Sequence, residues 1–172
     1  MTGGDTLASR LAALCPDVSL RVENDADRAF LSDLYASTRQ EELAPVPWDA
    51  ATKRGFLAEQ FTLQHAHYVK NYVGAEFIVI EQHGQSIGRI YVNRKGSEIR
   101  LMDIALVPEK RGQGIGRTLV EALARVARED AAEITLHVEP NNPAMKLYDR
   151  MGFTLIENRG VYLFLGLKPA PI

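Results

Sequence analysis

The run EKRGQGIGRTL, residues 109–119, combines basic side chains with glycines just before a helical pattern. The glycines lie at alternate positions, namely Gly112, Gly114 and Gly116. Each glycine raises the entropy cost of ordering the backbone, so a ligand that approaches the backbone closely would explain them. A helix that starts in such a loop leaves N–H groups free at its positive end, where an anion can bind. With Arg111, Arg117 and the Thr118 hydroxyl nearby, the run predicts a diphosphate site.

Two other nucleotide-binding loops fit this run less well. A Walker loop ends in Gly-Lys-Ser or Gly-Lys-Thr, whereas residues 116–118 read Gly-Arg-Thr after a different glycine spacing. A dinucleotide-binding loop needs GxGxxG, and Arg117 stands where its third glycine would be. Glu139 lies roughly where a ribose-binding acid would follow, so a nucleotide-dependent oxidoreductase stays an alternative.

Hydrophobic periodicity places the loop between a strand and a helix, in a chain that contains both kinds of element. Strands are expected over 18–24, 76–82, 86–94, 98–108, 133–140, 154–158 and 161–167. Helices are expected over 28–43, 48–72, 114–129 and 142–153. The order β-α-α-β-β-β-α-β-α-β-β predicts an α/β (α+β) fold, with a mixed, mostly antiparallel central sheet of six to seven strands and helices on both faces. The connection from 98–108 to 133–140 should be a right-handed crossover between parallel strands.

Length and composition favour a single domain over residues 1–172, with 1–16 expected as a loosely ordered tail or a short helix. A net charge of −2 gives no preference for nucleic acid or a membrane surface. No run approaches the roughly 20 apolar residues that a membrane span needs. Cys15 is the single cysteine, which favours a reducing compartment, and no secretory signal is evident, so a cytoplasmic location is expected.

Two segments match the motifs of one family residue by residue. RGQGIG, residues 111–116, has the form Arg/Gln-x-x-Gly-x-Gly/Ala and resembles the acetyl-CoA loop of the GCN5-related N-acetyltransferase (GNAT) superfamily. DIALVPEK, just before it, resembles that family's fourth strand. VEPNNPAMKLYDRMGF, residues 138–153, resembles its closing motif, Asn-x-x-Ala-x-x-x-Tyr-x-x-x-Gly-Phe. The matching residues are Asn141, Ala144, Tyr148, Gly152 and Phe153. The resemblance runs over about residues 18–167, and the element order agrees with it.

The resemblance implies a GNAT-like fold that binds acetyl-CoA beside the fourth strand. The pyrophosphate would sit on the backbone N–H groups of residues 113–116, helped by Arg111 and Arg117. The pantetheine arm would pair with the strand at Leu106 and Val107, which requires the sheet to splay after this strand. The implied cofactor-binding residues are Ile104, Leu106, Val107, Arg111, Gly112, Gln113, Gly114, Ile115, Gly116, Arg117, Thr118, Asn141, Ala144 and Tyr148.

The implied reaction is transfer of the acetyl group of acetyl-CoA to a primary amine by direct attack. A backbone N–H at Ile104 or Leu106 would polarise the thioester carbonyl. Tyr148 stands at the family's general-acid position, and a phenol of pKa ~10 matches a thiol leaving group; its alternative role is packing against the sheet. Asn141 would cap its helix, contact the pantetheine amides, or both. Two alternatives stay open: a CoA-binding module without catalysis, and an acyltransferase for a longer acyl-CoA.

No base for the acceptor amine can be assigned from the sequence. Strand alternation places Arg100 and Met102 on the same face as Ile104 and puts Asp103 on the opposite face, as a hydrogen-bond acceptor. We expect His137 to face away from the site. The other acidic candidates are Glu41, Glu42 and Glu139. If Arg100 faces the acceptor groove, it could bind a carboxylate or phosphate of the substrate.

The acceptor itself is left open, as a small-molecule amine or a protein amine. Residues 65–72, HAHYVKNY, would help to wall its site. His65 and His67 are two apart in a predicted helix and have no evident third ligand, so no metal site is expected. The last two predicted strands could pair across an interface, so a homodimer is one open form of assembly.

Overall fold

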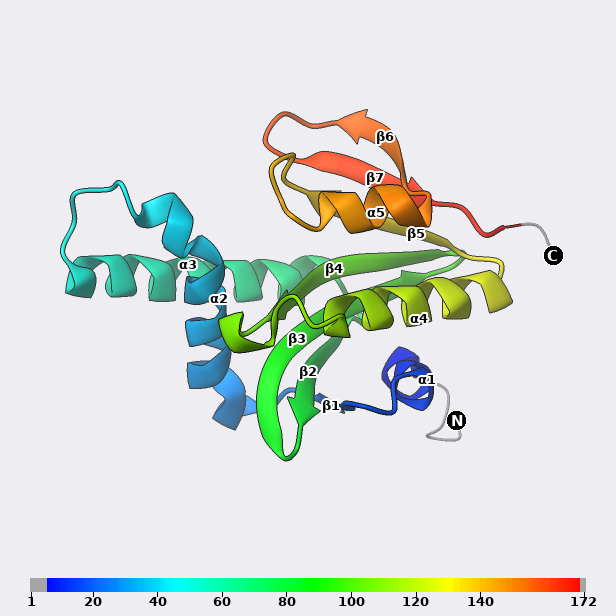
Figure 1. Cartoon of the computed structure of the whole chain (residues 1–172), viewed down its shortest axis with the longest axis horizontal. Coiled ribbons are helices and arrows are strands. Elements are labelled where there is room, and N and C mark those ends of the chain that lie inside the picture. The colour runs from blue at the N-terminus through cyan, green and yellow to red at the C-terminus, as the bar shows by residue number, and fades with distance from the viewer. Residues whose placement is uncertain (1–5, 171–172) are drawn as a thin grey trace.

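Seven strands form one mixed sheet, in the order β1-β2-β3-β4-β5-β7-β6, in the computed structural model, which describes residues 6–170 (Figure 1). The strands are β1 (Ser19–Val22), β2 (Glu76–Gln82), β3 (Gln85–Lys95), β4 (Glu98–Leu106), β5 (Glu133–Val138), β6 (Thr154–Asn158) and β7 (Leu163–Leu167). β4 and β5 pair in parallel, and every other neighbouring pair in this sheet is antiparallel. The predicted mixed sheet and its parallel pair are therefore confirmed.

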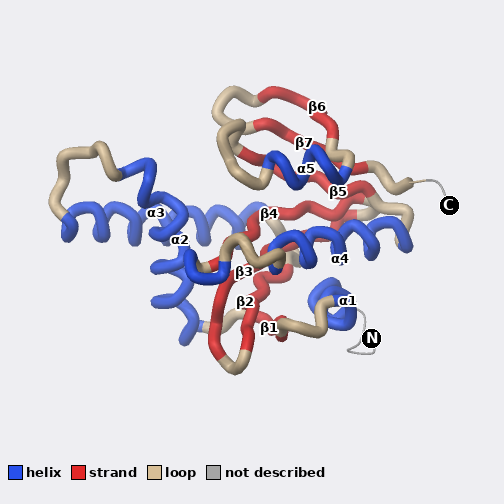
Figure 2. The backbone as a smooth tube through the Cα atoms, in the orientation of Figure 1, coloured by secondary structure: helices blue, strands red, loops and turns tan. Residues whose placement is uncertain are grey.

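Five α-helices cover the two faces of the sheet within the described residues (Figure 2). They are α1 (Leu7–Leu14), α2 (Arg28–Leu43), α3 (Ala50–Asn71), α4 (Ile115–Glu129) and α5 (Met145–Met151). α1, α4 and α5 pack their apolar sides on one face, and α2 and α3 pack on the other. The first turns of α3 and the loop before it extend beyond the sheet (Figure 2). Of the helices between residues 6 and 170, none combines the length and apolarity needed to cross a membrane.

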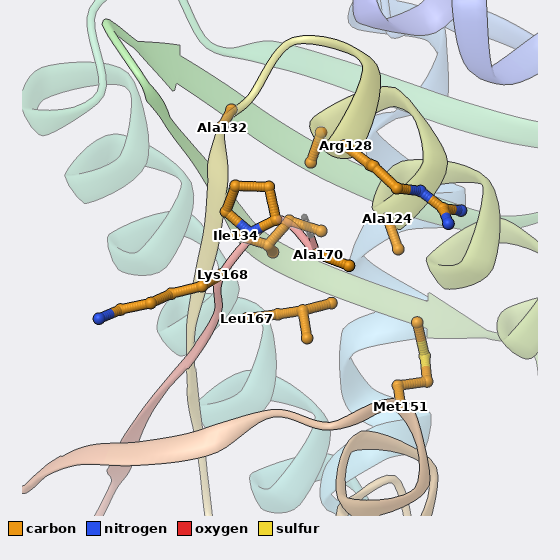
Figure 3. A pocket seen from close by; sticks show the side chains of 10 residues that line it. Ala124, Arg128, Ala132, Ile134, Met151, Leu167, Lys168 and Ala170 are labelled. Carbon is orange, nitrogen blue, oxygen red and sulfur yellow. The ribbon is translucent and has the colours of Figure 1, made fainter. Parts of the chain in front are cut away.

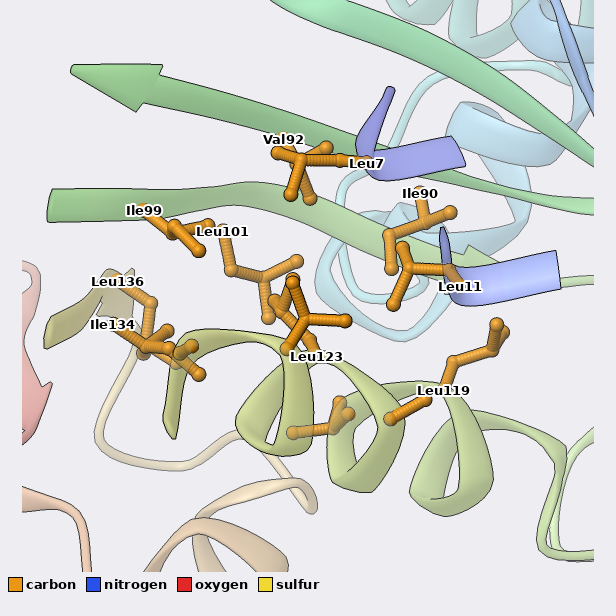
Figure 4. Packing of buried hydrophobic residues seen from close by; sticks show 14 of the residues in the cluster. Leu7, Leu11, Ile90, Val92, Ile99, Leu101, Leu119, Leu123, Ile134 and Leu136 are labelled. Atoms are coloured by element: carbon orange, nitrogen blue, oxygen red, sulfur yellow. The ribbon is translucent and has the colours of Figure 1, made fainter. Parts of the chain in front are cut away.

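The main core lies between the sheet and the helices α1 and α4 (Figure 4). α4 supplies Leu119, Leu123 and Val126, which recur at intervals of three and four residues and so form one apolar stripe toward the sheet. Leu7 and Leu11 of α1 pack onto the same core. This packing fixes α4 against the sheet, so the loop that precedes α4 stays beside the end of β4.

The predicted and observed elements differ mainly at their ends. Within the segment 1–16, expected as a tail or short helix, residues 7–14 form α1, and residues 1–5 lie outside the described part of the chain. The helix predicted over 142–153 starts later than expected, because Pro143 lies in the turn before α5. Proline has no N–H and a fixed φ, so it suits the entry to a helix rather than its interior.

β4 contains a bulge that changes which of its side chains share a face. Two consecutive residues of β3 pair with Leu101 and Asp103, so Met102 is an extra residue. An extra residue reverses the alternation beyond it. Arg100 and Asp103 therefore both extend toward α3, whereas Ile104 packs against the main core. The prediction that Arg100 shares a face with Ile104, opposite Asp103, is wrong because strict alternation does not include the bulge.

β4 and β5 separate after a short stretch of pairing. They pair over residues 98–101 of β4 and 133–136 of β5, although β4 continues to Leu106 and β5 to Val138. Along residues 102–106, the backbone of β4 has no β5 neighbour. The splay that the family resemblance requires is therefore present, and it opens toward the glycine loop at the end of β4.

Candidate active site

The loop between β4 and α4 depends on glycine at two positions. Gly112 and Gly114 have φ values of +73° and +86°, in the left-handed region that residues with a Cβ rarely adopt. Gly116 differs, because its φ is not positive and a Cβ built there would lie 3.9 Å from Leu106, an ordinary contact. The chain itself therefore does not require glycine at position 116, whereas a ligand lying between α4 and β4 would.

The N-terminus of α4 carries no side-chain cap. Its N-cap residue is Gly114, which has no side chain that could accept from the first N–H groups of the helix. Residues 111–114 are exposed, so these N–H groups stay accessible at the positive end of the helix dipole. The residues present therefore fit the diphosphate of coenzyme A.

Two polar side chains of the loop are held by neighbouring carbonyl groups. Arg111 donates from Nε to the Leu106 carbonyl at 2.9 Å, and from Nη2 to Ser37 Oγ of α2 at 3.0 Å. The Thr118 hydroxyl donates to the Gly114 carbonyl at 2.9 Å. The Thr118 proton therefore points into the helix, and Arg111 connects the loop to both α2 and β4.

Two further side chains of the loop make exposed contacts. Arg117 Nε pairs with Glu121 Oε1 at 2.8 Å, and Gln113 donates to the Glu109 carbonyl at 2.8 Å. Exposed contacts of this kind add little to stability, so both side chains can turn toward a ligand. Ile115 is half-buried and packs against the main core, which leaves its main chain as the part that faces the loop.

The β4 backbone expected to pair with pantetheine is only partly open. The Val107 N–H donates to the Ile87 carbonyl at 2.8 Å, and the Leu106 carbonyl accepts from Arg111. The side chains of Ile104, Leu106 and Val107 pack against the main core. The main chain of this stretch is therefore the part that faces the gap between β4 and β5. A ligand arm that pairs here would share the Leu106 carbonyl with Arg111 or displace it.

A cleft of about 500 Å³ lies between α2 and α3 on one side and the splayed parts of β4 and β5 on the other. Residues 100–105 form its β4 wall and residues 137–139 form its β5 wall. The tyrosines that line it are Tyr35, Tyr68, Tyr72 and Tyr162. Residues 65–72 contribute His67, Tyr68 and Tyr72 to this wall, so the cleft is placed where the acceptor site was expected.

Two carboxylates line the cleft, and each is paired with an arginine. Glu139 Oε1 lies 2.9 Å from Arg39 Nη1, so this pair connects β5 to α2. Asp103 pairs with Arg89, whose side chain is 2% exposed and also donates to Gln64 Oε1 of α3 at 3.0 Å. The Asp103 carboxylate is therefore held in the cleft wall by a buried arginine that α3 orients.

The remaining candidate bases fall into two groups. Glu41 and Glu42 are exposed on α2, away from the cleft lining. His137 lines the cleft together with Glu139, because residues two apart on a strand share a face, so the expectation that His137 faces away is wrong. Between residues 6 and 170, no three His, Cys, Asp or Glu side chains are grouped as a metal site would require.

Tyr148 lies in α5 with its ring in the main core. Its side chain is 4% exposed, and its ring contacts that of Phe153 at a centroid separation of 5.3 Å. Burial raises the pKa of Tyr148 to about 12, and the Asp103 carboxylate contributes in the same direction. The phenol therefore keeps its proton at neutral pH, which a general acid needs to do.

The turn before α5 is stabilised by Asn142 rather than by Asn141. Asn142 Oδ1 accepts from the Ala144 N–H at 2.9 Å, and Ala144 is the N-cap residue without a side-chain cap of its own. Both asparagines are exposed, and of the two only Asn142 lines the cleft. The prediction that Asn141 caps the helix is therefore wrong, because motif spacing alone chose between two neighbouring asparagines.

A smaller cavity of about 210 Å³ lies between α4, α5 and the segment after β7 (Figure 3). Its walls are mainly apolar, with Ile134, Met151 and Leu167 among them. Its charged lining residues are the two cations Arg128 and Lys168. This lining contains no carboxylate, histidine or tyrosine, whereas the lining of the larger cleft contains all three.

Residues 28–153 match the model of the family described as the acetyltransferase (GNAT) family. Because this match spans more than half of the chain, the protein belongs to that family.

Curated relatives match parts of the chain. A Bacillus subtilis protein named as a ribosomal protein bS18-alanine N-acetyltransferase is 32% identical over 108 residues, which are 62% of this chain and 64% of that protein. The mycothiol acetyltransferase of Corynebacterium kroppenstedtii is 30% identical over 86 residues, 49% of this chain and 21% of that enzyme. The chain thus spans less than two thirds of the length of these relatives.

Solved structures match nearly the whole chain in fold. The PaiA N-acetyltransferase of Thermoplasma acidophilum, in complex with coenzyme A, has a TM-score of 0.66 and 17% identity, covering 88% of this chain and 98% of that one. The ribosomal-protein-S18-alanine N-acetyltransferase of Escherichia coli has a TM-score of 0.58 and 17% identity, covering 90% and 96%. At such low identities these likenesses establish the fold alone.

Proposed function

We propose that the protein transfers the acetyl group of acetyl-CoA to a primary amine that enters the cleft between α3 and β4, by direct attack and with Tyr148 as the general acid. The observation that carries the proposal is the splay of β4 from β5. It connects the uncapped N-terminus of α4 to the cleft along the main chain of residues 102–106. A cofactor bound at the loop can therefore reach an acceptor bound in the cleft.

The loop would hold the cofactor through its main chain. The N–H groups of residues 113–116 bind the diphosphate, and Arg111 and Arg117 add positive charge once they leave their present contacts. When bound, acetyl-CoA supplies an activated acetyl thioester. A β4 N–H at Ile104 or Leu106 donates to the acetyl carbonyl, and a preorganised donor of this kind lowers the barrier by a few kcal/mol.

Two side chains would move the protons of the reaction. Tyr148 gives its proton to the departing thiolate, since its phenol is neutral at physiological pH. Asp103 takes up the proton of the acceptor amine. It lines the cleft, and its carboxylate is close enough to Tyr148 to raise the pKa of that phenol. Arg89 pairs with Asp103 and orients its carboxylate for this role.

The comparisons leave the acceptor open within this reaction. The names of the relatives mention the alanine of a ribosomal protein in one case and mycothiol in the other, so they do not select one acceptor for this chain. A longer acyl-CoA and a CoA-binding module without catalysis are the alternatives. The carboxylates and arginines that line the cleft favour catalysis over a module that only binds CoA.

Calorimetric titration of acetyl-CoA tests the site most directly. Gly116→Leu should abolish binding, because a side chain would fill the space between α4 and β4 that the backbone itself leaves open. Gly55→Leu, in the exposed interior of α3 with nothing within 4 Å of the added Cβ, is the matched control and should bind normally. Equal binding by both variants, or no binding by the native protein, would contradict the proposed site.

Transfer itself is tested by thiol release from acetyl-CoA with a panel of amines, together with the mass of the acetylated product. Tight acetyl-CoA binding without acetylation of any amine would favour the non-catalytic module. Faster release from propionyl-CoA or butyryl-CoA than from acetyl-CoA would favour the longer-chain acyltransferase.

A further inference from the structure

We infer that the acceptor amine carries a carboxylate, and that Arg100 binds this carboxylate at the closed end of the cleft. The inference rests on the proposed function, because it names the class of acceptor for that same site. It starts from the contacts of one half-buried arginine.

Arg100 lies where β4 and β5 are still paired, opposite Thr135. Its Nε donates to Thr135 Oγ1 at 2.7 Å, and its Nη1 donates to Tyr72 Oη of α3 at 3.2 Å. Its guanidinium also lies over the ring of Phe164, 5.1 Å from the centroid. Its side chain is 17% exposed and lines the cleft, so the guanidinium is fixed in place before any ligand arrives.

The charges of the cleft balance except at Arg100. The other two arginines of the lining are neutralised by its two carboxylates, Arg39 by Glu139 and Arg89 by Asp103. The carboxylate next to Arg100 is Glu98, outside the cleft lining, 44% exposed and 3.4 Å away. A contact of that length and exposure is weak. Among the described residues, the cleft therefore holds one cation more than its anions.

The surroundings of Arg100 increase this positive character. Phe164 contacts two guanidinium groups, since that of Arg159 is 4.3 Å from the same ring centroid. His137 stacks on Phe164 and accepts a hydrogen bond from Arg159 Nη1 at 2.7 Å. Burial lowers the pKa of His137, and the charges of Arg100 and Arg159 lower it further. The lowered pKa disfavours the imidazolium form, so the positive charge at this end of the cleft comes from the guanidinium of Arg100 rather than from His137.

The chemistry of the guanidinium selects the ligand. An arginine has five N–H donors, and those of Arg100 make three hydrogen bonds within the described residues. The donors that remain can bind a carboxylate in the planar geometry that arginine and carboxylate share. One unneutralised positive charge matches a carboxylate, whereas a phosphate monoester would bring about two negative charges.

The distance along β4 limits the shape of the acceptor. Arg100 is three residues from Asp103, so their backbones lie about 10 Å apart at strand spacing, less any shortening at the bulge. An acceptor whose amine and carboxylate are separated by several bonds spans this interval. An α-amino acid, which has both groups on one carbon, does not. The structure thus favours an ω-amino acid or a longer amine that bears a carboxylate.

Paired probes separate the carboxylate from the amine. 6-Aminohexanoate and hexylamine offer the same primary amine with and without the acid, and glycine offers both groups on one carbon. In thiol-release assays, 6-aminohexanoate should exceed the other two in kcat/KM by about 10- to 100-fold, the range of a hydrogen-bonded charge pair. Arg100→Gln should remove this preference, and Arg100→Lys should keep part of it. Arg125→Gln, an exposed arginine of α4, is the control and should retain it.

Binding of hexanoate, measured by ligand-observed NMR with coenzyme A present, provides a readout that needs no turnover. The native protein and Arg125→Gln should bind hexanoate, and Arg100→Gln should not. Equal kcat/KM for 6-aminohexanoate and hexylamine, or hexanoate binding that survives Arg100→Gln, would overturn the inference. Hexanoate binding that depends on Arg100, in a protein that acetylates no amine, would support the carboxylate site and contradict the proposed function instead.

Discussion

Arg100 and Asp103 lie on the same face of β4 although they are three positions apart, an offset that places residues of a regular strand on opposite faces. Met102, the extra residue of the bulge, reverses the alternation between the two. Both side chains consequently line one cleft, Arg100 beside Tyr72 and Asp103 beside Arg89. The bulge therefore brings a cation for the substrate and a carboxylate for proton transfer into a single site.

Asp103→Asn should lower kcat/KM by about 100-fold or more, because general acid–base groups typically contribute 100- to 10,000-fold. Acetyl-CoA affinity should be unchanged, since the loop lies outside the cleft. The variant should also lower the pKa of Tyr148, because it removes a negative charge that raises it. Ultraviolet titration measures this shift. The signal of Tyr148 is isolated in Asp103→Asn by subtracting the titration of Asp103→Asn/Tyr148→Phe, and in the native protein by subtracting that of Tyr148→Phe. A variant with native kcat/KM would show that the amine loses its proton to another group.

Tyr148→Phe should lower kcat by about 100- to 10,000-fold and leave the affinity for acetyl-CoA nearly unchanged. Phenylalanine keeps the ring that packs against Phe153 in the main core, so the free energy of unfolding should change little. Single-turnover thiol release, calorimetry and denaturant unfolding measure the three quantities. If kcat stays native, Tyr148 serves packing alone; if acetyl-CoA affinity falls instead, its hydroxyl contacts the cofactor.

Much of the fold could be predicted from the sequence because local signals and periodicity agree along the chain. The helix expected over 28–43 is α2, and its start follows Asn24, which accepts from the Ala26 N–H in a capping box with Asp27. The strand expected over 76–82 is β2 at the same bounds. The glycine loop could be found because positive φ at Gly112 and Gly114 is a requirement that only a few residue types meet.

The parts of the site that the sequence did not reveal depend on tertiary contacts. A bulge at Met102 cannot be recognised in an alternating pattern, so strict alternation predicts opposite faces for Arg100 and Asp103, which in fact share one. The pairing of Asp103 with Arg89 joins different strands and is oriented by Gln64 of α3, far away in sequence. Periodicity along one strand cannot report either relationship, because both depend on the neighbouring strand or helix.

Leu123→Ala should lower the free energy of unfolding by about 2–5 kcal/mol, the range for a truncated core leucine. Leu123 is fully buried on the stripe that holds α4 against the sheet (Figure 4). Leu63→Ala, on α3 with 57% of its residue exposed, is the control and should change stability by about 0.5 kcal/mol or less. Urea unfolding of both variants checks the difference. Equal losses would contradict the placement of α4 as the main cover of this core.

Asp130→Asn should destabilise the protein at neutral pH but not in acid. Asp130 Oδ2 lies 2.6 Å from Arg10 Nη1 and also pairs with Arg94, so it connects α1 and β3 to the end of α4. The hydrogen bond from Arg10, with that from Arg94, lowers the pKa of Asp130 below its usual range. A lowered pKa contributes stability above the unfolded pKa, about 3.9, and this contribution is lost as the pH falls through the folded pKa.

At pH 7 the loss of stability in Asp130→Asn should be about 1–2 kcal/mol. Once the pH is below the folded pKa of Asp130, the variant and the native protein should unfold at similar temperatures. Thermal unfolding from pH 2 to 8, with the exposed Asp33→Asn as control, measures the difference. A deficit that persists undiminished at the acid end would mean that Asp130 stabilises the fold through packing rather than through its charge.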